Sequence, residues 1–302
     1  MARIASVAGA VFTAVGILAP RPALAQATAH DHAADHAHSH ANAVVSCTDL
    51  AAPPWNGLPD ADREEVARLQ TELSALSTPE AAMAAGFRPA LGDIPGMGVH
   101  YVNSQRMQDG IHLDAPDHLL FAKIDGKDQL VGTAYAFRDV PDTDEPIPFR
   151  SDLAHWHDHP QFAPPGQTLH MLHVWFIPSS NGPFAGLNFW LPFRSAGITP
   201  PSACWMADEA DAQRIQRVSF ALAPRDWGSD GATVQQADVS AERTGILTDL
   251  DAAAKAGDHD AWMAAADRFI NDLSPAELAQ VEATLRALTM AQMSTSERET
   301  QN

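Results

Sequence analysis

Five histidines crowd one segment of this 302-residue chain: His155, His157, His159, His170 and His173. Neutral imidazole is the commonest metal-ligand side chain, and three protein ligands plus water is the usual arrangement at an open catalytic zinc site. Imidazoles also handle protons near neutral pH, and a His-rich stretch can be a solvated loop leading into a buried strand. The segment predicts a metal site, with the solvated loop an equal alternative for residues 155–159.

A second group of histidines lies in the low-complexity stretch "QATAHDHAADHAHSHANAVV", residues 26–45. Ala, His and Asp dominate this stretch, so it cannot build a core and we expect a disordered tail. A flexible His-rich tract can capture Zn(II), Cu(II) or Ni(II). The alternative is an inert polar leader. The histidines concerned are His30, His32, His36, His38 and His40.

Other side chains near the histidines in sequence could support a metal ion. Asp114, Asp117 and Asp158 could be ligands or could fix a histidine tautomer, and Tyr101 or Asp114 could handle protons. Thioethers favour Cu(I), although methionine is more often core filler; the ones nearby are Met97, Met107 and Met171. The chain lacks the H-E-x-x-H, CxxC, CxxCH and G-x-S-x-G motifs, so no familiar reaction is indicated.

Strand alternation sorts the histidines by face. In "GVHYVN" His100 shares a face with Val102, and Tyr101 points the other way. In "TLHMLHVWFIP" a regular strand places His170 and His173 on opposite faces. His170 and His173 therefore cannot both point into one site from a regular strand. Whether the 155–159 loop supplies a ligand stays open.

The surrounding patterns alternate between helix and strand in blocks. Residues 58–77 and 77–90 read as two helices with Asp60 and Thr78 as N-caps, followed by strands and a hairpin at "DGKD". From about residue 240 three helices follow, the second capped by Asp258 and the third opened by Ser274. This order predicts an α+β fold: an antiparallel sheet flanked by an N-terminal helical pair and a C-terminal helical segment.

The expected organisation along the chain has five parts. Residues 1–25 read as a signal peptide cleaved after Ala25, because a short apolar run precedes an A-x-A site. The tail 26–45 precedes an α+β core domain with the metal site over 46–235, then a helical segment over 236–295 and a disordered end over 296–302. Without a later membrane anchor, this predicts a periplasmic or secreted protein. Cys47 and Cys204 are then expected to form a disulfide.

Charge excludes some partners. With 19 basic and 38 acidic side chains the formal charge is -19, which argues against nucleic acid and an anionic membrane surface. A metal cation is a natural partner of such a surface.

Two motifs resemble a known family. "PGMGVHYVN", with Gly96, Met97, Gly98, His100 and Tyr101, and "LHVWFIPSSNGPFAGLN", with Leu172, His173, Val174, Trp175, Gly186 and Asn188, are similar to uncharacterised, mostly secreted bacterial proteins. That family, a domain of unknown function, is related to a small ring-forming thermophile domain. The family usually reads "NPxGxF" where this chain has "SSNGPFAG". The resemblance implies an antiparallel α+β core and homo-oligomers, and it implies no reaction. It singles out His100 and His173, so we expect His173 to meet His100 across the sheet.

Three functions fit these observations. A periplasmic metal-binding protein that takes Zn or Cu is favoured, because a His-rich tail accompanies a folded histidine cluster. A metal-dependent hydrolase or oxidoreductase using the same histidines is the first alternative. A metal-free oligomeric envelope or interaction domain is the second.

Overall fold

The computed structural model describes residues 46–139, 146, 148–159, 162–223 and 240–291. The expected signal peptide, the His-rich tail with its five histidines and the end 296–302 lie outside the described residues.

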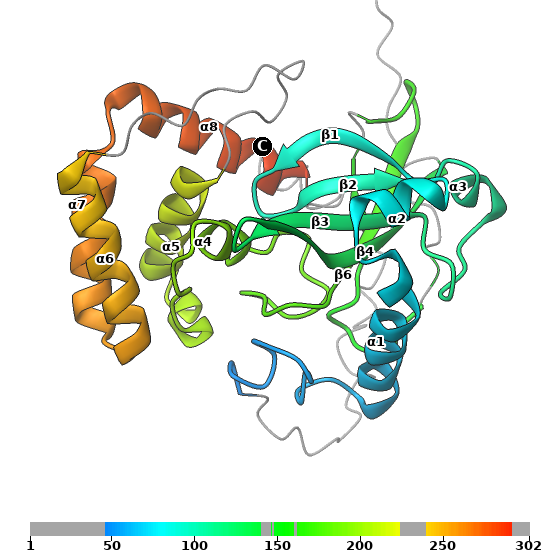
Figure 1. The fold of residues 1–302 in the computed structure, drawn as a ribbon, viewed down its shortest axis with the longest axis horizontal. Coiled ribbons are helices and arrows are strands. Elements are labelled where there is room, and N and C mark those ends of the chain that lie inside the picture. The colour runs from blue at the N-terminus through cyan, green and yellow to red at the C-terminus, as the bar shows by residue number, and fades with distance from the viewer. Residues whose placement is uncertain (1–45, 140–145, 147, 160–161, 224–239, 292–302) are drawn as a thin grey trace, which may run out of the picture. The chain divides into compact units, whose positions relative to one another are not determined.

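Six strands form one antiparallel sheet in the order β1-β2-β3-β4-β6-β5 (Figure 1). Neighbours in sequence are neighbours in the sheet up to β4. The last two strands exchange places, so β6 lies between β4 and β5, and β5 is an edge strand. The strands are β1 (Arg88–Ile94), β2 (Gly98–Val102), β3 (His118–Ile124), β4 (Lys127–Asp139), β5 (His157–Asp158) and β6 (Thr168–Trp175).

Glycines set two of the turns in this meander. Asp125 and Gly126 both have positive φ and join β3 to β4, which confirms the predicted hairpin. Gly98, at the start of β2, also has positive φ, and a Cβ there would collide with the carbonyl oxygen of Phe121 on β3. The "GMG" motif is thus explained by close strand approach at the beginning of the strand that carries His100.

The N-terminal helices cover one face of the sheet. Val66 and Leu69 of α1 (Asp60–Glu72) pack with Leu119 of β3 and Leu172 of β6 in one core. A 3₁₀ turn, Leu73–Leu76, leads to α2 (Pro79–Ala84), whose predicted cap is confirmed because Thr78 accepts a hydrogen bond from the Ala81 N–H. The Asp60 cap is wrong: Pro59 holds that position and Asp60 is the first helical residue.

The C-terminal helices build a second core together with α4 and α5. Within the described residues these helices are α4 (Leu191–Ser195), α5 (Glu209–Leu222), α6 (Ala241–Ala256), α7 (His259–Asp272) and α8 (Pro275–Ala291), with a 3₁₀ turn at Ala203–Ala207. The short helix α3 (Arg106–Asp109) is not part of this core. Figure 1 shows α5–α8 gathered beyond one end of the strands. Asp258 and Ser274 cap α7 and α8 as predicted, and Ser274 exchanges hydrogen bonds with Glu277. The sequence patterns did not predict α3, α4 or α5. The helix expected over residues 77–90 ends at Ala84, and β1 begins at Arg88 within that range.

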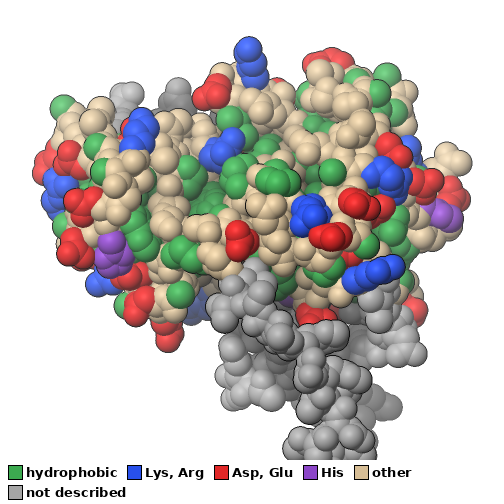
Figure 2. Space-filling model, turned by 90° about the horizontal axis from the view of Figure 1, so that it is seen from below, with side chains coloured by type: hydrophobic (Ala, Val, Ile, Leu, Met, Phe, Trp, Pro, Cys, Tyr) green, Lys and Arg blue, Asp and Glu red, His purple; other side chains and the backbone are tan. Residues whose placement is uncertain are grey.

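The predicted disulfide and α+β class are confirmed. Cys47 is bonded to Cys204, with 5.2 Å between the Cα atoms, and so ties the first described segment to the 3₁₀ turn before α5. No helix in the described ranges is long and apolar enough to cross a membrane. On the face shown in Figure 2, acidic and basic side chains are interspersed, so this face shows no field of one sign.

Candidate metal centre

Five buried imidazoles lie together on the sheet face opposite α1; they are called the imidazole cluster. Each is at most 4 % exposed. Ring centroids follow one another at 6.0 Å, 5.6 Å, 4.8 Å and 5.0 Å, which makes the cluster a continuous row. The members, in that spatial order, are His118, His100, His173, His157 and His159.

A contact of hydrogen-bond length joins the two histidines that the family resemblance singles out. Nε2 of His100 lies 3.3 Å from Nε2 of His173. One ring can donate to the other if their tautomers differ. Two nitrogens each about 2.0–2.1 Å from a tetrahedral zinc ion are separated by about 3.3–3.4 Å, so the same spacing suits two ligands of one ion.

The fold has to bring these two rings across two intervening strands. With β3 and β4 between them, their backbones in a flat sheet would be about 14 Å apart. Sheet twist and small side chains shorten the gap. Ala134 of β4 lies directly opposite His173, and Gly132 lies opposite Leu120, the partner of His100. The imidazoles can therefore reach toward each other above β4.

A buried carboxylate orients a third ring. Asp117 accepts a short hydrogen bond from Nδ1 of His118 through Oδ1, and its Oδ2 accepts from the Ala136 N–H at 3.1 Å. This fixes the tautomer of His118 and leaves its Nε2 lone pair available, the arrangement in which carboxylates support metal-bound histidines. His118 was not singled out from sequence, although its place two residues before Leu120, the cross-strand partner of His100, puts it on the same face.

Burial keeps the central imidazoles neutral. Desolvation lowers the pKa of His100 and of His157 well below the usual range, and neighbouring histidines lower both further. The pKa of His173 falls to about 3, again mainly by desolvation and then by His159 and His118. The carbonyl of Gly186 opposes part of that lowering of the His173 pKa. Neutral rings have the lone pair that a metal ion needs.

A neutral, buried His173 is expected to make the metal-free protein acid-sensitive. Its folded-state pKa of about 3 lies below the roughly 6.5 of an unfolded histidine, so the unfolded chain binds the proton first as pH falls. Stability is complete above about pH 6.5, and by about pH 4 this group alone lowers the free energy of unfolding by about 3 kcal/mol. Urea unfolding with a chelator present measures this. His173→Leu should flatten the slope; a wild-type value constant down to about pH 4 would contradict it.

Several expected site residues lie away from the imidazole cluster. His155 is exposed, because it precedes β5, which begins at the buried His157. Tyr101 points to the opposite face and packs on Phe121, as strand alternation requires, so it does not face the imidazole cluster. Asp114 is exposed in the turn before β3.

Asp158 pairs with His170, which does not belong to the imidazole cluster. It is buried and pairs with Nδ1 of His170 at 2.9 Å, and the His170 ring stacks on Phe137. Asp158 and His170 face each other across β5 and β6, on the side opposite His157 and His173. The predicted separation of His170 from His173 is therefore confirmed, and Asp158 is not a partner of the imidazole cluster.

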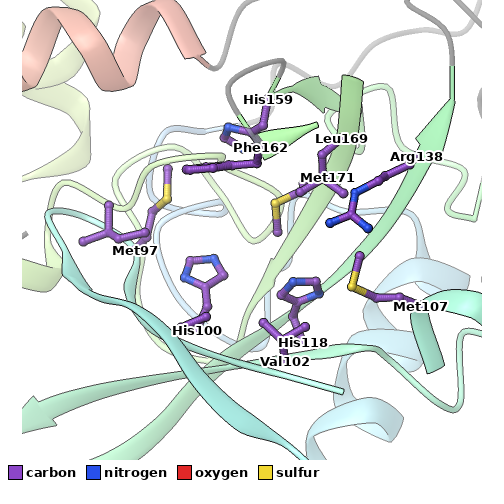
Figure 3. A pocket seen from close by; sticks show the side chains of 12 residues that line it. Met97, His100, Val102, Met107, His118, Arg138, His159, Phe162, Leu169 and Met171 are labelled. Carbon is purple, nitrogen blue, oxygen red and sulfur yellow. The ribbon is translucent and has the colours of Figure 1, made fainter. Parts of the chain in front are cut away.

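A cavity of about 180 Å³ borders the imidazole cluster and is called the methionine-lined cavity. Figure 3 shows His100 and His118 on one side of it, His159 on the other, and thioether groups between them. Arg138 reaches its edge. The remaining lining is apolar: Ala90, Ile94, Met97, Val102, Met107, Phe162, Leu169 and Met171.

Two further observations bear on identity. In the part of the chain that the structure describes, no group of three or more His, Cys, Asp or Glu side chains is already arranged to hold a metal ion. No protein-family model, curated protein or solved structure matches this chain.

Proposed function

We propose that this protein is a secreted or periplasmic metal-binding protein whose imidazole cluster takes a zinc or copper ion. The observation that carries the proposal is the 3.3 Å approach of the Nε2 atoms of His100 and His173. Burial favours the neutral form of both rings, so neither carries a positive charge that would oppose a cation.

A third ligand would come from rotation of a neighbouring ring. His118 is the best candidate, because Asp117 already holds its Nδ1–H and so orients the ring with Nε2 available. His157, whose ring centroid is 4.8 Å from that of His173, is the alternative. Imidazole ligands suit zinc and copper, and the thioethers of the methionine-lined cavity would favour Cu(I) over Zn(II).

The wider proposal includes the expected leader and tail. We infer that cleavage after Ala25 releases a mature chain whose histidines between positions 30 and 40 capture metal outside the core. The Cys47–Cys204 disulfide supports an oxidising compartment. Membership of the family with the "GMGxHYV" and "LHVW" motifs, and its homo-oligomers, stay proposals that rest on the resemblance.

Calorimetric titration of the metal-free protein with Zn(II), and with Cu(I) under anaerobic conditions, tests the proposal. The titration uses the full chain with the five tail histidines changed to glutamine, and about one ion per chain is expected. Asp117→Asn should weaken binding by about 10–100-fold, because the support of His118 is lost. Asp158→Asn, the matched control on the opposite sheet face, should leave affinity unchanged. No binding in the parent, or equal loss in both variants, would contradict the proposal.

A metal-dependent enzyme is a second candidate, favoured by the methionine-lined cavity beside the histidines. A cavity of about 150 Å³ suffices for benzene, so this one admits a small, largely apolar molecule. Co(II)-substituted protein distinguishes the two functions. A visible spectrum that changes with azide would show an open coordination position and favour an enzyme. An unchanged spectrum would favour binding alone.

The metal-free assembly domain gains no support from the described surface. Trp190 is buried and Trp205 packs against the helical core, so neither marks an exposed apolar patch. The large hydrophobic side chains exposed among the described residues are Met83 and Leu153, which belong to different parts of the chain.

A further inference from the structure

The imidazole cluster lies between two cavities. The second, called the His155 cavity, has a volume of about 320 Å³ and is bordered by His155 and His157. His100 borders the methionine-lined cavity, and His173 lies between His157 and His100 in the row. A path of imidazoles therefore runs from exposed His155 to the buried pair.

The linings of the two cavities differ in what they admit. The methionine-lined cavity offers mainly apolar side chains, and the exposed guanidinium of Arg138 stands at its edge. A cation that entered on that side would meet a like charge before it reached the imidazoles. The His155 cavity has no Lys or Arg in its described lining, and Asn181, Gln216 and Thr289 provide oxygen atoms at its wall.

His157 is placed to receive an ion from that side. It is 3 % exposed, borders the His155 cavity, and its Nε2 has no hydrogen-bond partner among the described residues. Its ring centroid is 5.0 Å from that of His159 and 4.8 Å from that of His173. Exposed His155 is close enough to act electrostatically on His157.

We propose that the metal cation reaches the His100–His173 pair through the His155 cavity, where His155 captures the hydrated ion and His157 passes it inward. Each transfer exchanges one water or imidazole ligand for the next imidazole, and no redox step is involved. The proposal rests on the metal-binding function above. It assigns His155 a role in the rate of loading, since its exposed ring lies outside the final site.

Stopped-flow loading of the metal-free chain with Zn(II) tests the route, with transfer from a chromophoric chelator as the readout. The tail histidines are again changed to glutamine, so that only the folded part is observed. His155→Ala should slow loading by about fivefold or more, whereas His155→Asp should restore the rate, because a carboxylate also attracts and binds the ion. Equilibrium affinity should change by less than about twofold in both, since His155 is not a final ligand.

Two control variants are expected to leave the loading rate unchanged. His112→Ala removes another exposed imidazole and should leave the loading rate unchanged. Arg138→Glu reverses the charge at the methionine-lined cavity and should also leave it unchanged. Faster loading in Arg138→Glu, or a wild-type rate in His155→Ala, would overturn the route while leaving the metal-binding function intact. Failure of the parent to bind Zn(II) at all would overturn both.

Discussion

Replacing His100 and His173 together by leucine is expected to abolish metal binding and to stabilise the metal-free protein. Loss of two central ligands should weaken affinity by at least about a thousandfold, more than the 10–100-fold attributed to an outer partner. Each ring also leaves its Nδ1 without a hydrogen bond of standard geometry among the described residues. Removing both of these buried polar groups should raise the free energy of unfolding at neutral pH by about 2 kcal/mol.

His170→Leu is the matched control for this double variant. His170 is on the same strand and equally buried, but it faces the other side and pairs with Asp158. Its replacement should leave metal affinity unchanged and destabilise the fold by about 1–3 kcal/mol, because the buried carboxylate loses a partner. Calorimetry and urea unfolding measure both quantities. A double variant that binds normally, or one as destabilised as His170→Leu, would show that the His100–His173 contact is structural.

Removal of the Cys47–Cys204 disulfide should produce the largest loss of stability. The bond closes a loop over a sequence separation of 157 residues. Chain entropy for a loop of that length predicts that replacing both cysteines by serine lowers the free energy of unfolding by about 5 kcal/mol. For a protein of this size the melting temperature should fall by roughly 10–20 °C.

Thermal unfolding of the wild type with and without reductant provides the comparison. Reduced wild type should melt together with the double serine variant, and reductant should leave the variant unchanged. If oxidised and reduced wild type melt at the same temperature, the disulfide contributes little to stability. Hydrophobic packing would then be enough to hold the first described segment in place.

Much of the fold could be predicted because its signals are local. Side chains alternate along any strand, so His100 could be separated from Tyr101, and His173 from His170, without knowing the neighbours of either strand. Caps act within one turn, which is why Thr78 and Ser274 could be recognised. The Asp60 cap was wrong by one residue, because the carbonyl of Pro59 already accepts the hydrogen bond from the Arg63 N–H that begins the helix.

The composition of the site depended on contacts that no local pattern encodes. His118 joins the imidazole cluster because β3 pairs in register with β2, and Asp117 supports it because its other oxygen meets the backbone of β4. Asp158 is adjacent to His157 in sequence, yet serves His170. Register is decided by pairing and burial of whole strands, so these partners follow only from the assembled sheet.

By itself the sequence determined the α+β class, the face of each histidine on its strand, the two cysteines and the acidic charge, since these depend on residue identity and spacing. The tertiary structure alone decided which histidines meet. It brought His100 within 3.3 Å of His173 over Ala134, divided the 155–159 histidines between the surface and the imidazole cluster, and opened a cavity on each side of that cluster. The physical reason is that such contacts arise from sheet order, twist and side-chain volume, which act between residues far apart in the chain.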